Sequence, residues 1–500
     1  MFAPFLQSLA RHYCLDFISD IESGVLNFKQ VSKQSDERKD QGVMVGSLVC
    51  SYEGKRIVLH AISGISKEVV LGSTLKNTSA HTSELPETSA HKNTSAHTNE
   101  LPTTSAHKDT SAPGAASYTK NGILHIIVPA IASEPEVALA LTKNDERIHE
   151  LTSIINSLKK QNKDCTKEKN ERTTLCDESL RKVFSLYTFT RFDQTQITLD
   201  QIILQNGGKL PPTGTGDCCA PKLLSYAFKN GYDIISMDEV YFGKDTQNKT
   251  NGVSYTPCDE RCGFILPHIL GLEILYRDSQ IIVVNKQSGL LSVPGRGEDK
   301  KDSVEYRVRR LFGGCIEQPA VHRLDMETSG ILVLAFTKEA HKNLNKQFEE
   351  GRVQKKYTAL LDGLLENAKG ELAPKNGETS GLIKLKFRLD VENRPHQIYD
   401  EVYGKEGITE WKKEGTKLYV NPLTGEKKRL TRVTFIPHTG RTHQLRLASA
   451  SLKGLGLPIT GDTLYGNYTE GERLMLHACE ITFEHPVTKE RMHFMVPPPF

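Results

Sequence analysis

The stretch VHRLDMETSG at residues 321–330 runs directly into the apolar run ILVLAF at residues 331–336. A continuous apolar run of this length predicts a buried strand, and the polar segment before it predicts a loop. A helical pattern over residues 338–350 follows and stops at a glycine. We therefore expect Asp325 to lie on a loop that is held by a rigid strand.

Further strands are predicted on both sides of this segment. Residues 273–284 give a two-part strand pattern, and residues 353–361 a strand that carries Tyr357. Residues 431–436 alternate as another strand, before a tight turn after which a helix is expected to open at Arg441. Alternation of strands with helices is compatible with a parallel as well as a mixed sheet.

The composition of the chain limits its class. Five hundred residues predict two or more structured regions. Hydrophobic residues make up 37% and charged residues 25%, and no apolar run approaches the roughly eighteen residues of a membrane span, so a membrane protein is not expected. Residues 1–17 have no basic start, no continuous apolar stretch and no cleavage site, so we expect a cytoplasmic protein and no secretory signal.

Charge permits nucleic-acid binding without arguing for it. Residues 271–500 contain 35 basic and 30 acidic residues, against 29 and 31 in the rest of the chain. The C-terminal half is therefore the better partner for a phosphate backbone, although so small an excess also fits solubility alone.

The N-terminal half divides into segments of different texture. Residues 42–64 predict a strand hairpin, and the heptad spacing that starts at Asn144 predicts a helical hairpin or short coiled coil through Leu186. Between them the sequence NTSAHT at 77–82 returns at 93–98, in a tract too poor in large apolar groups to fold. With a boundary near Gly263, the expected regions are 1–75, 76–113 (disordered), 114–263 and 264–500.

Ten cysteines in a chain of this length are too few for a disulfide scaffold. Cys258 and Cys262 could contribute two ligands to a structural zinc site, completed by Cys218 or Cys219 and by His268. Buried or free thiols are the alternative, and the spacing does not decide between them.

Without family knowledge, a loop aspartate beside an arginine indicates no more than a surface ion pair or a helix cap. The segment 321–330, however, resembles in full the active-site signature of the RluA-type pseudouridine synthases. Three further segments resemble motifs of that family in the expected order: KYTA at 356–359, GRTHQLR at 440–446 and GDTLYG at 461–466. Parts of the N-terminal half resemble the extension of a long-chain bacterial subgroup of these enzymes: residues 42–64, 216–224 and 257–262.

The resemblance implies an α+β catalytic domain around a mixed, mainly antiparallel sheet. It also implies an RNA pseudouridine synthase that isomerises uridines in ribosomal RNA, or in transfer RNA, by base flipping and without a cofactor or a metal. Two alternatives remain at this stage. One is a catalytically inactive RNA-binding or ribosome-assembly protein with the same fold, and the other is a hydrolase that uses Asp325 as a base. Oligomeric state is not predicted.

The resemblance implies three catalytic residues. Asp325 either attacks the anomeric carbon or removes a proton from the adjacent ribose carbon, and the residues do not choose between these routes. Arg441 is expected to pair with Asp325 and to favour its charged form. Tyr357 is expected to stack on the reacting base and to take part in proton transfer at carbon 5.

A second set of residues is expected to bind the substrate or to shape the site. Arg323 is the candidate for filling the gap that the flipped base leaves. His322 is more compatible with a structural hydrogen bond than with acid–base catalysis. The complete set is Arg323, His322, Thr328, Lys356, Thr442 and Gln444.

Overall fold

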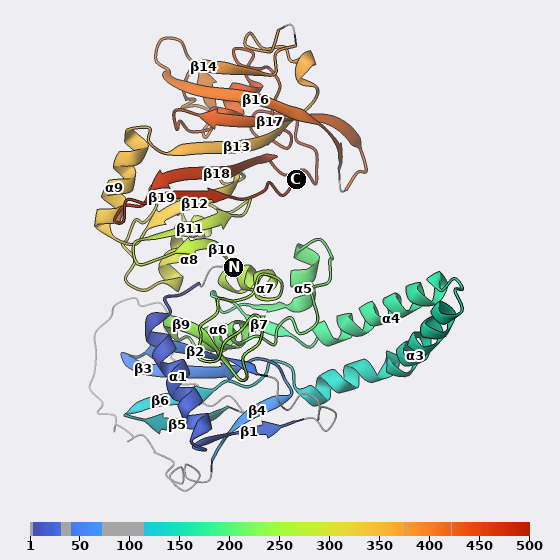
Figure 1. The fold of residues 1–500 in the computed structure, drawn as a ribbon. Helices are drawn as coiled ribbons and strands as arrows, with labels where there is room; N and C mark the ends of the chain where they lie inside the picture. Colours follow the sequence, from blue (N-terminus) through green and yellow to red (C-terminus); the bar gives the residue numbers. More distant parts are fainter. Residues whose placement is uncertain (1–3, 32–41, 73–114, 376, 422) are drawn as a thin grey trace, which may run out of the picture. The chain divides into compact units, whose positions relative to one another are not determined.

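The computed structural model describes residues 4–31, 42–72, 115–375, 377–421 and 423–500 (Figure 1). The repeat that was expected to be disordered lies outside the described residues. The chain separates into two compact units, Ala3–Ile269 and Leu270–Phe500. Within the described parts of the chain, no helix is both long enough and apolar enough to cross a membrane.

The N-terminal unit is built on a five-stranded sheet in the order β5-β6-β3-β2-β9. Its strands are β2 (Val43–Tyr52), β3 (Lys55–Ile62), β5 (Ala116–Lys120), β6 (Ile123–Ile127) and β9 (Asp233–Phe242). The predicted hairpin is present as the antiparallel pair β2–β3. Two helices, α1 (Ser8–Glu22) and α6 (Cys219–Lys229), pack on this sheet.

Successive residues of β2 face different helices. Val45 packs into the core with residues of α1 such as Phe17. Its neighbour Gly46 points the other way, where a Cβ would collide with Cys219 at the start of α6. Because successive residues of a strand face opposite sides, α1 and α6 cover opposite faces of the sheet.

Smaller elements complete this unit. They are β1 (Leu26–Gln30) with β4 (Lys67–Leu71), β7 (Thr188–Thr190) with β8 (Gln196–Thr198), α5 (Leu199–Gln205) and α7 (Cys262–Leu270). Gly263, where the boundary was expected, is thus the second residue of a helix, and the units divide at the end of that helix.

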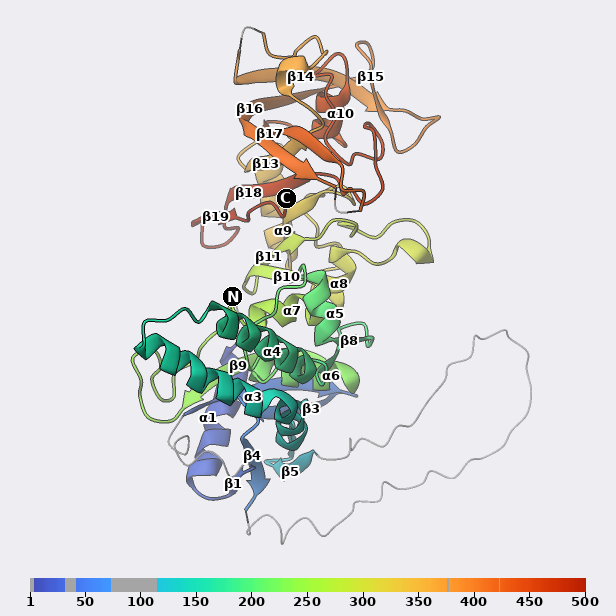
Figure 2. The same cartoon turned by 90° about the vertical axis from the view of Figure 1, so that its right-hand side faces the viewer.

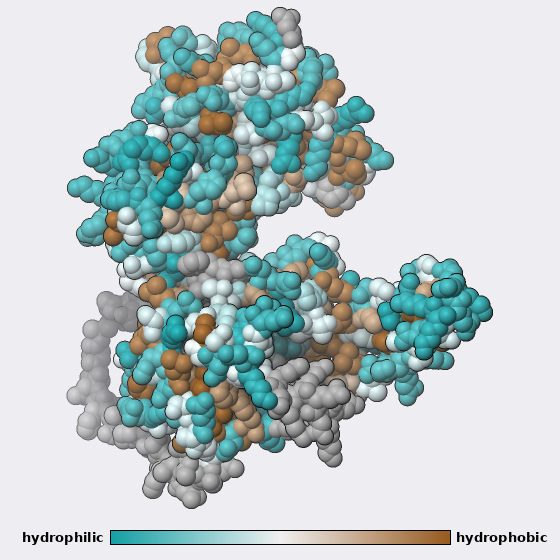
Figure 3. Space-filling model, in the orientation of Figure 1, coloured by the Kyte–Doolittle hydropathy of each residue, from teal (hydrophilic) through white to brown (hydrophobic). Residues whose placement is uncertain are grey.

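A helical hairpin, α3 (Glu134–Lys160) with α4 (Thr166–Phe184), follows β6, and the two helices lie side by side in Figures 1 and 2. Leu151 and Ile155 are buried between them, and the end of the hairpin is largely hydrophilic in Figure 3. The helix starts ten residues before the predicted Asn144. Ser133 and Glu136 form a capping box there, and the first turns do not follow the heptad spacing.

The C-terminal unit contains one ten-stranded sheet in the order β10-β11-β12-β18-β13-β17-β16-β14-β15, with β19 paired to β18. Only β12 and β18 pair in parallel among these strands, so the sheet is mixed and mainly antiparallel, as expected. The strands are β10 (Glu273–Arg277), β11 (Ile281–Lys286), β12 (Ser329–Ala335), β13 (Gln354–Leu361), β14 (Ser380–Leu389), β15 (Gln397–Tyr399), β16 (Lys405–Val420), β17 (Lys427–Pro437), β18 (Leu476–Glu484) and β19 (Arg491–Met495). The helices are α8 (Val304–Leu311), α9 (Lys338–Glu349) and α10 (Gln444–Ala450), with short 3-10 turns at Glu298–Lys300 and Leu365–Asn367.

The strand predicted at 331–336 is β12, and every residue of it is buried. Gly330 lies where β12 pairs in parallel with β18, with a φ of 118°, and a Cβ there would collide with the backbone of Ala478. The glycine of the quoted segment is therefore required by the close approach of two strands. The loop that carries Asp325 ends where this pairing begins.

Candidate active site

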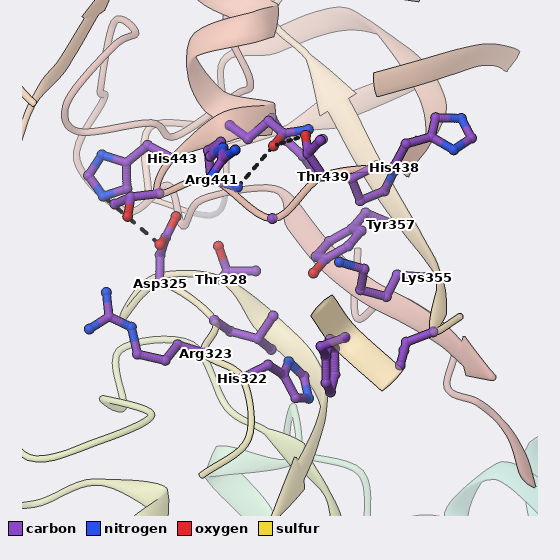
Figure 4. A pocket seen from close by; sticks show the side chains of 18 of the residues that line it. His322, Arg323, Asp325, Thr328, Lys355, Tyr357, His438, Thr439, Arg441 and His443 are labelled. Carbon is purple, nitrogen blue, oxygen red and sulfur yellow. Dashed lines mark hydrogen bonds and ion pairs between the residues drawn. The ribbon is translucent and has the colours of Figure 1, made fainter. Parts of the chain in front are cut away.

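A pocket of about 570 Å³ opens beside the Asp325 loop (Figure 4). Its lining comes mainly from three segments that are distant in sequence: residues 321–328, residues 348–357 from the end of α9 into β13, and the turn and helix of residues 437–446. Leu476 of β18 completes it. Asp325, Thr328 and Tyr357 point into the same space in Figure 4. A volume of this size is within the range of pockets that hold a small ligand.

The loop that carries Asp325 is fixed through its backbone. Lys286, which is 1% exposed, donates from Nζ to the carbonyl oxygens of Leu290 at 2.6 Å and Met326 at 2.9 Å. Ser292 both donates to the Leu324 carbonyl and accepts from its N–H. These contacts hold the residues on both sides of Asp325, so its carboxylate is presented from a rigid support.

The ion pairs of Asp325 differ from the prediction. Arg446 Nη1 lies 3.9 Å from Oδ2, and His443 Nε2 lies 4.0 Å from Oδ1. Arg441 is exposed, and its Nε lies 3.4 Å from the Glu406 carbonyl oxygen. The expected pairing of Arg441 with Asp325 is therefore wrong for this structure. Arg446 is the arginine that pairs with Asp325.

Arg446 is held by acids from two other segments. Its guanidinium, 2% exposed, donates to both carboxylate oxygens of Asp462, at 2.8 and 2.6 Å, and to Glu327 at 2.9 Å. Asp462 also accepts the backbone N–H groups of Leu464 and Tyr465. A planar guanidinium with two-point contacts is geometrically fixed, so Arg446 offers Asp325 a positive charge that cannot move away.

His443 precedes α10 in a left-handed conformation, with φ 55°, which is uncommon for a residue with a side chain. Its Nδ1 lies 2.8 Å from the Tyr465 hydroxyl, which accepts the N–H of Gln397. A hydroxyl that already accepts a hydrogen bond is free to donate its own proton, which places the ring hydrogen on Nε2, facing Asp325. Burial lowers the pKa of His443, so the neutral ring is favoured.

The two neighbouring lysines of β13 have opposite orientations. Lys355 and Tyr357 line the pocket, whereas Lys356 reaches Glu480 across the sheet at 2.9 Å. Lys356 therefore lies outside the pocket in which it was expected to bind the substrate, because residues two apart share a strand face and adjacent residues do not. Burial, followed by the charge of Asp325, raises the pKa of Tyr357, so its hydroxyl keeps its proton.

Gln444 contributes to the turn above the pocket. Its carbonyl oxygen accepts Thr439 Oγ1 and the Arg441 N–H, and its amide donates to the Ile408 carbonyl and to Thr409. All these contacts are inside the protein, so the structure assigns Gln444 to positioning the turn, and the expectation that it binds substrate is not supported. The helix also begins at Gln444 and not at Arg441.

The remaining predicted residues lie around the pocket as follows. Arg323 and Thr442 are exposed in its lining, and Thr328 is buried there with no hydrogen-bond partner for Oγ1 among the described residues. His322 Nε2 accepts the Val333 N–H at 3.0 Å, and burial lowers the pKa of His322 to about 3. A neutral ring that accepts a strand N–H has the structural role that was expected for His322.

Comparisons with known proteins match the C-terminal part of the chain. Residues 280–451 match the model of a family described as RNA pseudouridylate synthase. The dual-specificity RNA pseudouridine synthase RluA of Haemophilus influenzae is 42% identical over 226 residues, which span 45% of this chain and 91% of that protein. The RluA of Pasteurella multocida is 39% identical over 251 residues, 50% of this chain and 99% of that protein. A solved structure, human RNA pseudouridylate synthase domain containing 1, is 29% identical and covers 46% of this chain and 84% of its own, with a TM-score of 0.35.

These matches show that the protein is an RNA pseudouridine synthase, an isomerase that acts on RNA. More narrowly, the chain belongs to the RluA-type family. The matches cover nearly the whole length of these relatives but only about half of this chain. The other half of this chain therefore has no counterpart in them.

Proposed function

We propose that Asp325 is the catalytic carboxylate with which this enzyme isomerises uridine, and that Tyr357 and Arg446 complete the centre. The supporting observation is the position of the Asp325 carboxylate, which faces the pocket beside the fixed guanidinium of Arg446. The positive charge of Arg446 stabilises the negative charge that Asp325 needs as a nucleophile or base.

The reaction breaks the bond between N1 of uracil and C1′ of ribose, turns the base, and forms a bond from C5 to C1′. Asp325 assists the cleavage, by attack on C1′ or by removal of a ribose proton. After C5 is joined, its proton must leave and N1 must gain one, so the product has the same atoms as the substrate. Tyr357 lines the same pocket, which supports its assignment to stacking on the base. Its protonated hydroxyl acts in the proton exchange as a relay, which gives one proton and takes up the other, so that it is protonated before and after the reaction.

Binding of the flipped nucleotide is assigned to the rest of the lining. Thr328 Oγ1, buried with no hydrogen-bond partner in the described part of the chain, is available to a polar atom of the nucleotide. Arg323, Arg441, Thr442 and Lys355 carry donors or cations at or near the opening, where the phosphates of a flipped nucleotide pass. Arg323 is the candidate for occupying the gap in the RNA stack.

We further propose ribosomal RNA as the main target and transfer RNA as a second one, in the cytoplasm. The relatives at about 40% identity are named as dual-specificity enzymes, which favours more than one RNA target. The inactive RNA-binding alternative has no observation in its favour, since the pocket holds the carboxylate, the tyrosine and the cation together.

The test is a pseudouridine map of total RNA from cells with and without this gene. Loss of one or more ribosomal sites, restored by the parent gene but not by Asp325→Asn, is expected. An unchanged map of both ribosomal and transfer RNA would overturn the target proposal. Restoration by Asp325→Asn would overturn the assignment of the carboxylate.

A further inference from the structure

Three cysteines from two distant segments meet in the N-terminal unit. Cys218 directly precedes α6, and Cys258 and Cys262 flank the turn that enters α7. Their sulfur atoms all lie within 4.8 Å of one another. No part of the pseudouridine reaction uses these thiols, which belong to a different unit from Asp325.

Two other residues that could have been zinc ligands, Cys219 and His268, lie outside this cluster. Cys219 Sγ contacts the carbonyl oxygens of Met44 and Ala61, on the sheet side of α6. His268 Nε2 faces the side-chain amide of Asn206 at 3.3 Å. The sequence suggested four protein ligands, including His268. The structure brings together three, the sulfur atoms of Cys218, Cys258 and Cys262.

The backbone around the cluster is arranged for thiolates. Cys218 is the N-cap residue of α6 but makes no side-chain cap hydrogen bond, although serine, threonine, aspartate and asparagine are the residues that usually cap helices. A helix N-terminus favours a negatively charged sulfur. The other two cysteines are four positions apart in a turn closed by the Gly263 N–H and the Cys258 carbonyl, at 3.0 Å, a spacing within the usual range of zinc ligands.

The Cys258 sulfur has polar neighbours of its own. It lies beside the Cys218 and Cys262 sulfur atoms and accepts hydrogen bonds from the backbone N–H groups of Cys262 and Arg261. Three negatively charged sulfurs in contact would repel one another unless a cation lay between them. Zinc bound at about 2.3 Å from each sulfur would space them about 3.8 Å apart, which small side-chain movements achieve from the observed cluster.

We propose that Cys218, Cys258 and Cys262 bind one Zn²⁺ ion as thiolates, with a water molecule as the fourth tetrahedral ligand. Each thiol releases its proton when it binds, and no oxidation or reduction is involved. Exposure of Cys258 gives the solvent ligand access. The ion fastens the start of α6 to the start of α7, the helix at whose end the catalytic unit begins.

The test is metal analysis of the full chain, purified under reduction and without a metal-affinity tag. One zinc ion per chain is expected, and Cys218→Ser, Cys258→Ser and Cys262→Ser should each reduce the content to a trace. Cys219→Ser, a change at the adjacent cysteine, and Cys315→Ser, in the other unit, are the matched controls and should keep the zinc. Zinc absent from the parent protein, or retained by all three cluster variants, would overturn the proposal.

A second measurement does not depend on the variants folding. Titration of the parent protein with a mercurial thiol reagent should release zinc to a chromogenic chelator, and Co²⁺ exchanged into the site should show sulfur-to-cobalt charge-transfer bands. A non-reducing mass two units lower, from a disulfide between two of the three cysteines, would overturn the proposal. Stoichiometric iron or copper in place of zinc would overturn it as well.

Discussion

The inner wall and the rim of the pocket differ in how the protein holds them. We call Asp325, Thr328, His443 and Arg446 the inner wall, and Arg323, His438, Arg441 and Thr442 the rim. The inner wall is buried or half-buried, and Arg446 alone contacts three carboxylates. The side chains of the rim are exposed.

This difference suits the two groups of residues to different functions, charge stabilisation during the reaction and binding of the RNA backbone. Groups that are fixed by hydrogen bonds can stabilise charge at a definite atom, as the reacting ribose requires. Exposed cations on a turn can adapt to a phosphate backbone, and their substitution changes the free energy of unfolding little. Changes to the inner wall should therefore affect turnover and stability, and changes to the rim should affect RNA affinity.

The largest expected effect is that of Asp325→Asn. The amide has the shape of the carboxylate but neither its charge nor its basicity, so turnover should fall by at least about 1000-fold. Tritium release from RNA labelled at C5 of uridine measures turnover, and filter binding measures RNA affinity, which should be retained. Turnover within about tenfold of the parent would remove Asp325 from the centre.

The next effect compares two arginines of the same segment. Arg446→Met leaves Asp325, Glu327 and Asp462 without their shared cation and should lower the free energy of unfolding by about 3–5 kcal/mol. Arg441→Met, an equal change in charge and size on the rim, should alter it by less than about 0.5 kcal/mol. Urea denaturation of both full-length variants measures the difference, and equal losses would contradict the division into wall and rim.

A smaller effect is expected for the two lysines of β13, one of which lines the pocket. Lys355→Ala removes a pocket cation and should lower the slope of log affinity against log salt by about 1. Lys356→Ala breaks the ion pair with Glu480, on the other face of the strand, and should leave RNA affinity unchanged. RNA binding over a salt series measures both, and a larger loss for Lys356→Ala would mean that the wrong face had been assigned.

The last effect concerns acid stability. The pKa of His322 is lowered from 6.5 to about 3, chiefly by burial. Its contribution to stability is therefore complete above pH 6.5 and is lost as the pH falls toward 3. His322→Gln, which can still accept the Val333 N–H, should show a shallower fall in Tm between pH 6.5 and 4. Parallel curves would exclude His322 as a source of acid lability.

The strands that the sequence predicts well are those with continuous or alternating apolar residues, such as β12 and β13. β16 was not predicted, because lysine and glutamate occupy its exposed positions and only a few residues, Trp411 among them, are buried. Propensity is a weak guide where a strand is stabilised mainly by its pairing with β14 and β17.

The site was predicted to the level of segments and not of side chains. GRTHQLR contains two arginines, and sequence alone does not show which one turns inward. The signal that could have decided is position: Arg446 falls within α10, three residues after His443, whereas Arg441 follows a glycine in a turn. Asp462 and Glu327 lie in the quoted segments, but their contact with Arg446 depends on long-range folding.

The place of β18 in the sheet has a consequence for the synthesis of the protein. β12 and β13 are consecutive strands in the sequence, yet β18, which is made near the end of the chain, lies between them. A nascent chain on the ribosome therefore carries the Asp325 loop and the Tyr357 strand with no strand to join them, and their open edges are exposed to wrong pairing. The two strands can therefore be joined in one sheet only after Leu476–Glu484 has left the ribosome, near the end of synthesis.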